Sequence, residues 1–96
     1  MKRNNTYNLK VEEVALKDET LKPSKSLEFQ FENHDNVFDI LDAIENKNLF
    51  NDSNQDKEFA IGLKLFSEVL IKNRKHEIFK EFSPHFKMFM QKLKAY

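Results

Sequence analysis

The chain has 96 residues, of which 40% are hydrophobic and ten are Phe, so it can build the core of one domain and need not be disordered. It contains no Cys and one Gly, which excludes disulfides, thiolate metal sites and Cys nucleophiles, together with the Gly-rich phosphate loops of nucleotide-binding proteins. The N-terminus lacks the apolar run of a signal peptide and no segment approaches a membrane span, so we expect a soluble, cytoplasmic protein with no membrane partner.

The net charge of zero conceals a segregation of charge along the chain. Residues 32–58 carry eight acidic and two basic side chains, a net charge of −6, whereas residues 62–96 carry eight basic and three acidic ones, a net charge of +5. A basic half is typical of proteins that bind polyanions. The interpretation that we favour is that the acidic and basic segments face each other, within one fold or across a dimer.

The first third of the chain predicts a β-hairpin over residues 6–32. Apolar residues alternate with polar ones in Tyr7–Glu12 and again in Leu27–Glu32, which is typical of strands with one buried face. Between the two runs, residues 17–25 contain Pro23 and predict an exposed loop.

Residues 33–96 have the period of helices. Asn33 or Asp35 could serve as N-cap of the first helix, and Ser83 followed by Pro84 is a start signal for the last one, with Ser83 as N-cap. A short helical turn around Phe79 precedes that last helix. The first helix is predicted from apolar residues at the spacing i, i+3, i+4, i+7, namely Val37, Ile40, Leu41 and Ile44.

The longest predicted helix runs from about Gln55 to Asn73, and Asp52 with Gln55 forms the better of two capping pairs before it. Its apolar residues fill an arc of about 200°, wider than the stripe of roughly 100° that packing on one side requires. We therefore expect cover on two sides, by the hairpin and by other helices, or partly by a second subunit. Gly62 lies near the centre of the arc. Because glycine has a low helix propensity, it is either a close-packing position or a result of ordinary sequence drift, and we give the two interpretations equal weight.

The basic segment comprises Lys72, Asn73, Arg74, Lys75 and His76, and it is a candidate anion or interaction site. Cations in the last turn of a helix also complement the helix dipole, and we favour this structural interpretation. Nucleic acid is a possible but less favoured partner, because the chain has fourteen Lys and only two Arg, the residue that most often reads base edges.

A second candidate cluster consists of Asn33, His34 and Asp35, at the junction between the hairpin and the helical part. No two histidines of the chain share a spacing that places them on one helix face, and Lys80 stands where a zinc-protease motif beginning at His76 would need its second His. We therefore predict no metal, no cofactor and no catalytic residues, and we lean toward a protein that is not an enzyme.

One set of residues carries a family resemblance. It consists of the block GLKLFSEV of residues 62–69, KNRKH of residues 72–76 and the later residues Phe79, Pro84, Phe86, Phe89, Met90, Leu93 and Lys94, together with Phe29, Phe38 and residues 32–35. On these residues the chain resembles a family of short bacterial proteins, about 95 residues long, that is described as a domain of unknown function. The resemblance implies a stand-alone bacterial α+β domain and brings no activity, cofactor or catalytic residue with it.

The predicted fold is α+β, with residues 1–96 as a single domain in which three or four helices cover one face of a two-stranded antiparallel hairpin. The predicted function is a non-catalytic module for protein interaction or self-association, with a second copy or another protein as partner. The alternative is anion or nucleic-acid binding through the basic segment. A weaker alternative is a small-ligand binder or enzyme with a pocket between hairpin and helices.

Overall fold

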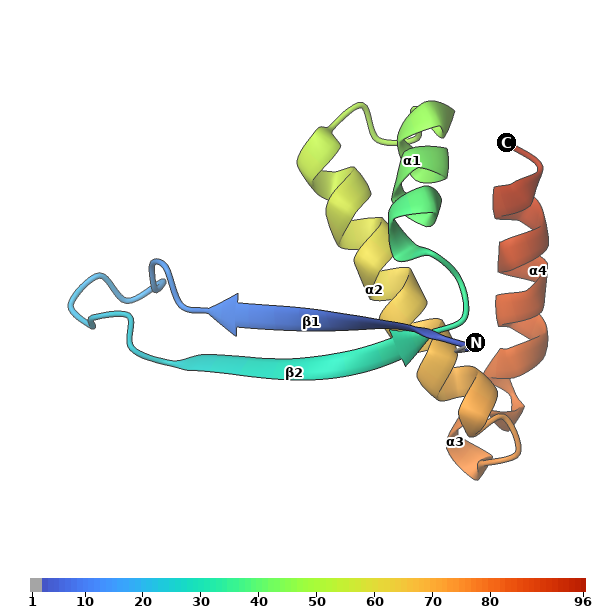
Figure 1. Ribbon diagram of the computed structural model, residues 1–96, viewed down its shortest axis with the longest axis horizontal. Helices are drawn as coiled ribbons and strands as arrows, with labels where there is room; N and C mark the ends of the chain where they lie inside the picture. The colour runs from blue at the N-terminus through green and yellow to red at the C-terminus, as the bar shows by residue number, and fades with distance from the viewer. Residues whose placement is uncertain (1–2) are drawn as a thin grey trace. The chain divides into compact units, whose positions relative to one another are not determined.

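The computed structural model describes residues 3–96, which form two strands followed by four helices (Figure 1). The predicted α+β class is confirmed. Along residues 3–96 no helix combines the length and the hydrophobicity that crossing a membrane requires. The elements are β1 (Asn5–Glu12), β2 (Ser26–Asn33), α1 (Val37–Lys47), α2 (Ser53–Lys72), α3 (Glu77–Lys80) and α4 (Phe82–Lys94).

The chain divides into two compact units, a hairpin unit that ends at Asp35 and a helical unit that begins at Asn36. The boundary falls three residues after the predicted end of the hairpin part at residue 32. The grouping of both units into a single domain stays a prediction.

The hairpin unit has the two apolar strand faces that the alternating sequence predicts. Antiparallel pairing places Tyr7 opposite Phe31, Leu9 opposite Phe29 and Val11 opposite Leu27, so all six apolar side chains share one face. The rings of Tyr7 and Phe31 lie with their centroids 5.4 Å apart. Cross-strand pairs of this kind are the unit of sheet stabilisation. The sequence pattern predicts which side chains share the face, and the structure supplies the pairing between the strands.

The loop between the strands is held at its base by one carboxylate. Glu13 Oε1 accepts hydrogen bonds from the N–H groups of Ser24 at 3.1 Å and Lys25 at 2.7 Å. The backbone N–H of Ser24, and then that of Lys25, holds the pKa of Glu13 below its usual range, because both donors favour the ionised form. In the loop, the hydroxyl and N–H of Thr20 lower the pKa of Asp18 in the same way.

Helix α1 begins at Val37, one residue later than a cap at Asp35 predicts and three later than a cap at Asn33 predicts, because its N-cap is Asn36. The Asn36 side chain accepts hydrogen bonds from the N–H groups of Phe38 at 2.9 Å and Asp39 at 3.4 Å. The predicted caps Asn33 and Asp35 are wrong. Asn33 is still the last residue of β2, and its Oδ1 accepts instead from the N–H of Asp35 at 3.0 Å.

Helix α2 has the predicted N-cap and starts at Ser53, two residues before the predicted start at about Gln55. Asp52 is the N-cap, and its Oδ1 accepts from the N–H groups of Asn54 at 2.9 Å and Gln55 at 3.2 Å. The helix runs for 20 residues and ends at the C-cap Asn73, close to the predicted end. The start is fixed by local chemistry, because the Asp52 carboxylate accepts hydrogen bonds from N–H groups that have no partner inside the helix.

The predicted start of the last helix at Ser83 is wrong, because α4 already begins at Phe82. Glu81, between α3 and α4, keeps helical backbone angles of φ −74° and ψ −32°, so the chain never leaves the helical conformation long enough for a cap. The Ser83 hydroxyl instead donates to the carbonyl of Phe79 at 2.8 Å, the usual bond of a serine inside a helix. Pro84 is tolerated in the first turn, where its missing N–H costs no intrahelical bond.

The core of the helical unit joins its three longer helices. Ile44 of α1, Ala60 of α2 and Leu93 of α4 are the buried members, with exposed fractions of 3%, 0% and 8%. The small side chain of Ala60 allows α1 to approach α2 closely. Partly buried residues surround this centre, namely Ile40, Leu41, Leu49, Phe59, Leu63 and Met90.

Candidate functional site

The centre of the apolar arc of α2 is exposed rather than buried. Gly62 lies on the surface, as do Phe66 and Val69, whose exposed fractions are 43% and 53%. A Cβ atom at Gly62 would meet nothing within 4 Å among the described residues. The prediction that Gly62 is a close-packing position is therefore wrong for this chain by itself.

The buried side of α2 lies instead toward one edge of the arc and includes residues that hydrophobicity ranks low. Ala60 and Ser67 are buried together with Asp56 and Leu70. Small side chains let neighbouring backbone approach, so burial follows packing distance as well as polarity. The apolar arc therefore predicts the wrong buried side of α2, because the centre of the arc faces solvent.

Phenylalanine rings link α2 to the later helices. The Phe66 ring packs edge-on against those of Phe79, Phe82 and Phe86 with centroid separations of 6.2, 6.0 and 6.0 Å. These arrangements are the favoured edge-to-face geometry of aromatic pairs. These four rings are therefore packed against one another, although Phe66 and Phe82 each keep 43% of their surface exposed.

The apolar face of the hairpin is also largely open to solvent. Val11, Leu27 and Phe29 have exposed fractions of 54%, 55% and 42%. Within the described part of the hairpin unit the sheet has only the two strands, and none of its own residues forms a further layer on this face. An isolated two-stranded hairpin is marginal in water, which makes this face a candidate interaction surface.

The basic segment spans the end of α2 and the turn into α3. Two of its members have structural roles: the Asn73 side chain donates to the carbonyl of Val69 at 2.8 Å, and His76 Nδ1 accepts from the N–H of Ile78 at 3.1 Å. Among residues 3–96 no hydrogen bond or ion pair engages the side chains of Lys72, Arg74 and Lys75, which are exposed. The segment thus presents three cations to solvent.

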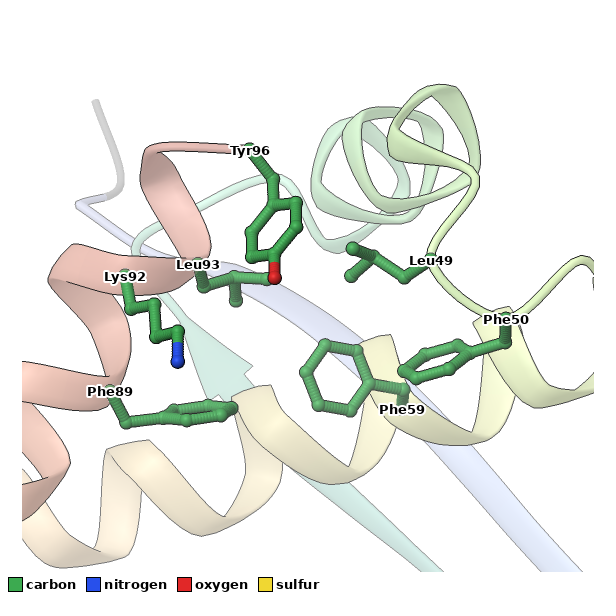
Figure 2. Close-up of a pocket in the computed structure, with 7 residues that line it drawn as sticks. All are labelled: Leu49, Phe50, Phe59, Phe89, Lys92, Leu93 and Tyr96. Atoms are coloured by element: carbon green, nitrogen blue, oxygen red, sulfur yellow. The ribbon is translucent and has the colours of Figure 1, made fainter.

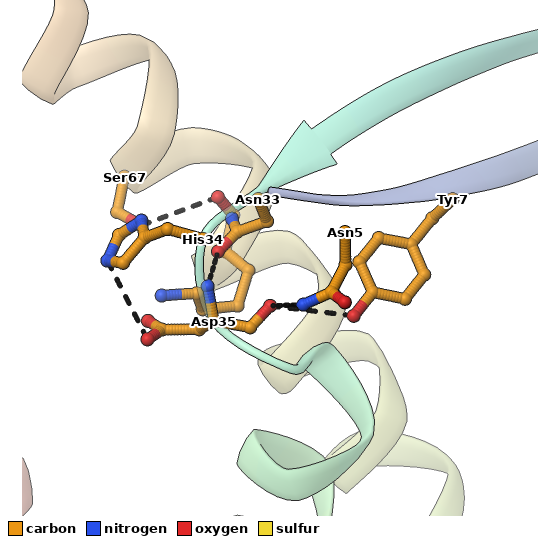
Figure 3. A network of polar contacts seen from close by, with 7 residues as sticks. Asn5, Tyr7, Asn33, His34, Asp35 and Ser67 are labelled. Atoms are coloured by element: carbon orange, nitrogen blue, oxygen red, sulfur yellow. Dashed lines mark hydrogen bonds and ion pairs between the residues drawn. The ribbon is translucent and has the colours of Figure 1, made fainter. Parts of the chain in front are cut away.

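The second cluster ties the end of β2 to the start of β1 (Figure 3). The Asp35 carbonyl accepts from Asn5 Nδ2 at 3.3 Å and from the Tyr7 hydroxyl at 3.5 Å, and His34 Nε2 lies 3.6 Å from Asp35 Oδ1. Asn33 is 1% exposed, and its Nδ2 has no hydrogen-bond partner among the described residues. These bonds brace the hairpin, and they bring Asn33, His34 and Asp35 together with Asn5 and Tyr7. Whether this cluster meets the basic segment stays untested.

Over residues 3–96, no group of three or more His, Asp or Glu side chains could hold a metal ion. One feature that the sequence did not reveal is an apolar pocket within the helical unit (Figure 2). Its wall combines the loop after α1 with α2 and α4, so no local pattern could have indicated it. A pocket between the hairpin and the helices stays a prediction.

Comparisons with known proteins identify the family of the chain but indicate no activity for it. A family model described as a domain of unknown function with a solved structure matches residues 5–95. A crystal structure of a protein of unknown function from Pectobacterium atrosepticum is similar, with 39% sequence identity, a TM-score of 0.82, and coverage of 97% of this chain and 99% of that one. No curated protein matches the chain. The predicted resemblance to a family of unknown function is thereby confirmed.

Proposed function

The chain belongs to the DUF3861 family of domains of unknown function, and we propose that it is a non-catalytic module that associates with a second copy of itself through the apolar face of the hairpin. The observation that carries this proposal is the exposure of Val11, Leu27 and Phe29 on that face. Exposed contiguous apolar surface is typical of protein interaction sites. Burying it would also stabilise a sheet that is marginal by itself.

The shape of the face favours another sheet as its cover. Three cross-strand pairs, from Tyr7–Phe31 to Val11–Leu27, line up along it, and none of their six residues is charged. Two such faces can pack about 10 Å apart, as the two layers of a β-sandwich do. A twofold symmetric dimer brings the same patch of both copies together, so one apolar face supplies both halves of the interface.

The charge of the chain is also compatible with self-association. Its net charge is zero, so two copies do not repel each other through net charge. Residues 32–58 carry a net charge of −6 and residues 62–96 one of +5. Each copy therefore presents an acidic and a basic segment to the other. This supports a second copy as the partner over a strongly charged protein.

Sedimentation equilibrium with two lysine variants of the same strand tests the proposal. We expect the wild type to be dimeric at tens of micromolar, and Phe29→Lys to be monomeric because it places a charge on the apolar face. Gln30→Lys adds the same charge on the opposite face and should remain dimeric. A monomeric wild type, or equal behaviour of the two variants, would contradict the proposal.

A second candidate function is anion binding by the basic segment, supported by the unpaired side chains of Lys72, Arg74 and Lys75 among the described residues. The test measures binding of a single-stranded oligonucleotide as a function of salt. Three cations that each release a counterion give a slope of log K against log [salt] of about −2. Changing the three cations of the basic segment to Gln should abolish that slope. The control variant, with Gln at the hairpin lysines Lys17, Lys22 and Lys25, should preserve it. Equal loss in both variants would contradict a specific site.

A further inference from the structure

The apolar pocket of the helical unit has the size and the lining of a small-ligand site. It is an open pocket of ≈ 420 Å³ between the loop that follows α1, the first half of α2, and the last turns of α4 with the residue Tyr96 that follows them. Pockets that bind small molecules measure about 300–1,000 Å³ and are lined mainly by apolar side chains with a few polar groups. The lining residues are Leu49, Phe50, Phe59, Phe89, Lys92, Leu93 and Tyr96.

Three phenylalanines form one wall of this pocket. The Phe59 ring lies edge-on to Phe50, with centroids 5.2 Å apart at 77°, and edge-on to Phe89, at 6.3 Å and 78°. Phe50 and Phe89 keep exposed fractions of 39% and 44%, so part of their surface is free for a ligand. Aromatic groups prefer such edge-to-face neighbours, and the wall therefore suits a flat aromatic body.

The polar groups of the pocket select the charge of its ligand. Lys92 is the one charged residue among the described residues that line it. Figure 2 shows the Lys92 ammonium and the Tyr96 hydroxyl extending into the space beside the phenylalanine rings. In residues 3–96 no hydrogen bond or ion pair engages Lys92 Nζ. An ammonium donates three hydrogen bonds and a phenol donates one, so both can bind the oxygens of an anion.

We propose that this pocket binds a small carboxylate with an aromatic body, whose acid group contacts Lys92 and Tyr96 while its ring lies against Phe59 and Phe89. A cationic ligand would be repelled by Lys92, whereas a neutral one would gain no charge-assisted hydrogen bond from this ammonium, which is exposed to water in the free protein. Hydrogen bonds between an ammonium and a carboxylate are the stronger, charge-assisted kind. The inference does not depend on self-association of the hairpin.

Titration of the ¹⁵N-labelled protein with 4-phenylbutyrate, followed by amide chemical shifts, tests the proposal. The probe has few atoms, so its dissociation constant should be on the order of millimolar. We expect saturable shifts at the amides of the pocket residues. The uncharged analogue 4-phenylbutan-1-ol should bind about two- to fivefold more weakly, the ratio that corresponds to a partly exposed ion pair.

Two variants of α4 separate a ligand contact from a structural role. Lys92 and Lys94 both lie in the last turn, where either complements the helix dipole, but only Lys92 lines the pocket among the described residues. Lys92→Met should lower the affinity for the acid to that for the alcohol, whereas Lys94→Met should leave both affinities unchanged. The proposal is overturned if the acid gives no saturable shifts, if acid and alcohol bind the wild type equally, or if both variants act alike.

Discussion

Replacing Gly62 by Ala should stabilise the protein, and the size of the effect follows from the structure. Gly62 lies in the middle of α2, is exposed, and has room for a Cβ atom because nothing lies within 4 Å among the described residues. None of the described residues with a positive φ is a glycine, so its backbone already suits an L-residue. The gain is then the difference in helix propensity, about 1 kcal/mol.

Thermal unfolding followed by circular dichroism measures this gain. For a chain of this size, about 1 kcal/mol raises Tm by roughly 4–8 °C. Ala43→Gly, at an exposed position inside α1, is the matched reverse substitution and should lower Tm by a similar amount. A lower Tm for Gly62→Ala would refute the reasoning, because it would mean that another chain packs against the bare backbone at Gly62.

Three further substitutions test other parts of the fold. Asp52→Ala removes the acceptor at the start of α2 and should lower the free energy of unfolding by about 1 kcal/mol in urea denaturation, whereas Asp52→Asn should restore most of it. Phe66→Ala removes three edge-to-face ring contacts and should cost about 2 kcal/mol, less than the 3–5 kcal/mol of a fully buried Phe, because the ring is partly exposed; a loss below about 0.5 kcal/mol would contradict that packing. Glu13 has a lowered pKa in the folded protein, so its contribution to stability is present above the unfolded pKa and is lost as the pH falls through the folded pKa. Glu13→Gln should therefore lower stability at neutral pH and have no effect well below both pKa values, and equal effects at the two pH values would refute the assignment.

The parts of the fold that the sequence predicted are those that depend on near neighbours. Alternation of apolar residues around Leu9 and Phe29 determined which residues of the hairpin share its apolar face. The acceptor at Asp52 determined the start of α2, because the unsatisfied donors lie within three residues of it. Family membership was also accessible, since the matching residues extend over nearly the whole chain.

The parts that the sequence missed depend on distant packing. Hydrophobicity placed the buried side of α2 around Gly62, whereas the helix buries Ala60 and Ser67, small residues that allow close approach. The start signal at Ser83 was overridden because the preceding residue pair was already helical. The pocket around Lys92 joins three separate segments, so neither its apolar wall nor its ammonium was visible in any local pattern.

The most direct test of self-association is an isotope-filtered NOE experiment on a mixture of ¹³C-labelled and unlabelled protein. Contact between the two hairpin faces predicts NOEs from the labelled methyl groups of Val11 and Leu27 to the ring of Phe29 in the unlabelled copy. The absence of intermolecular NOEs, or NOEs confined to Phe66 and Val69 on the exposed side of α2, would contradict pairing through the hairpin.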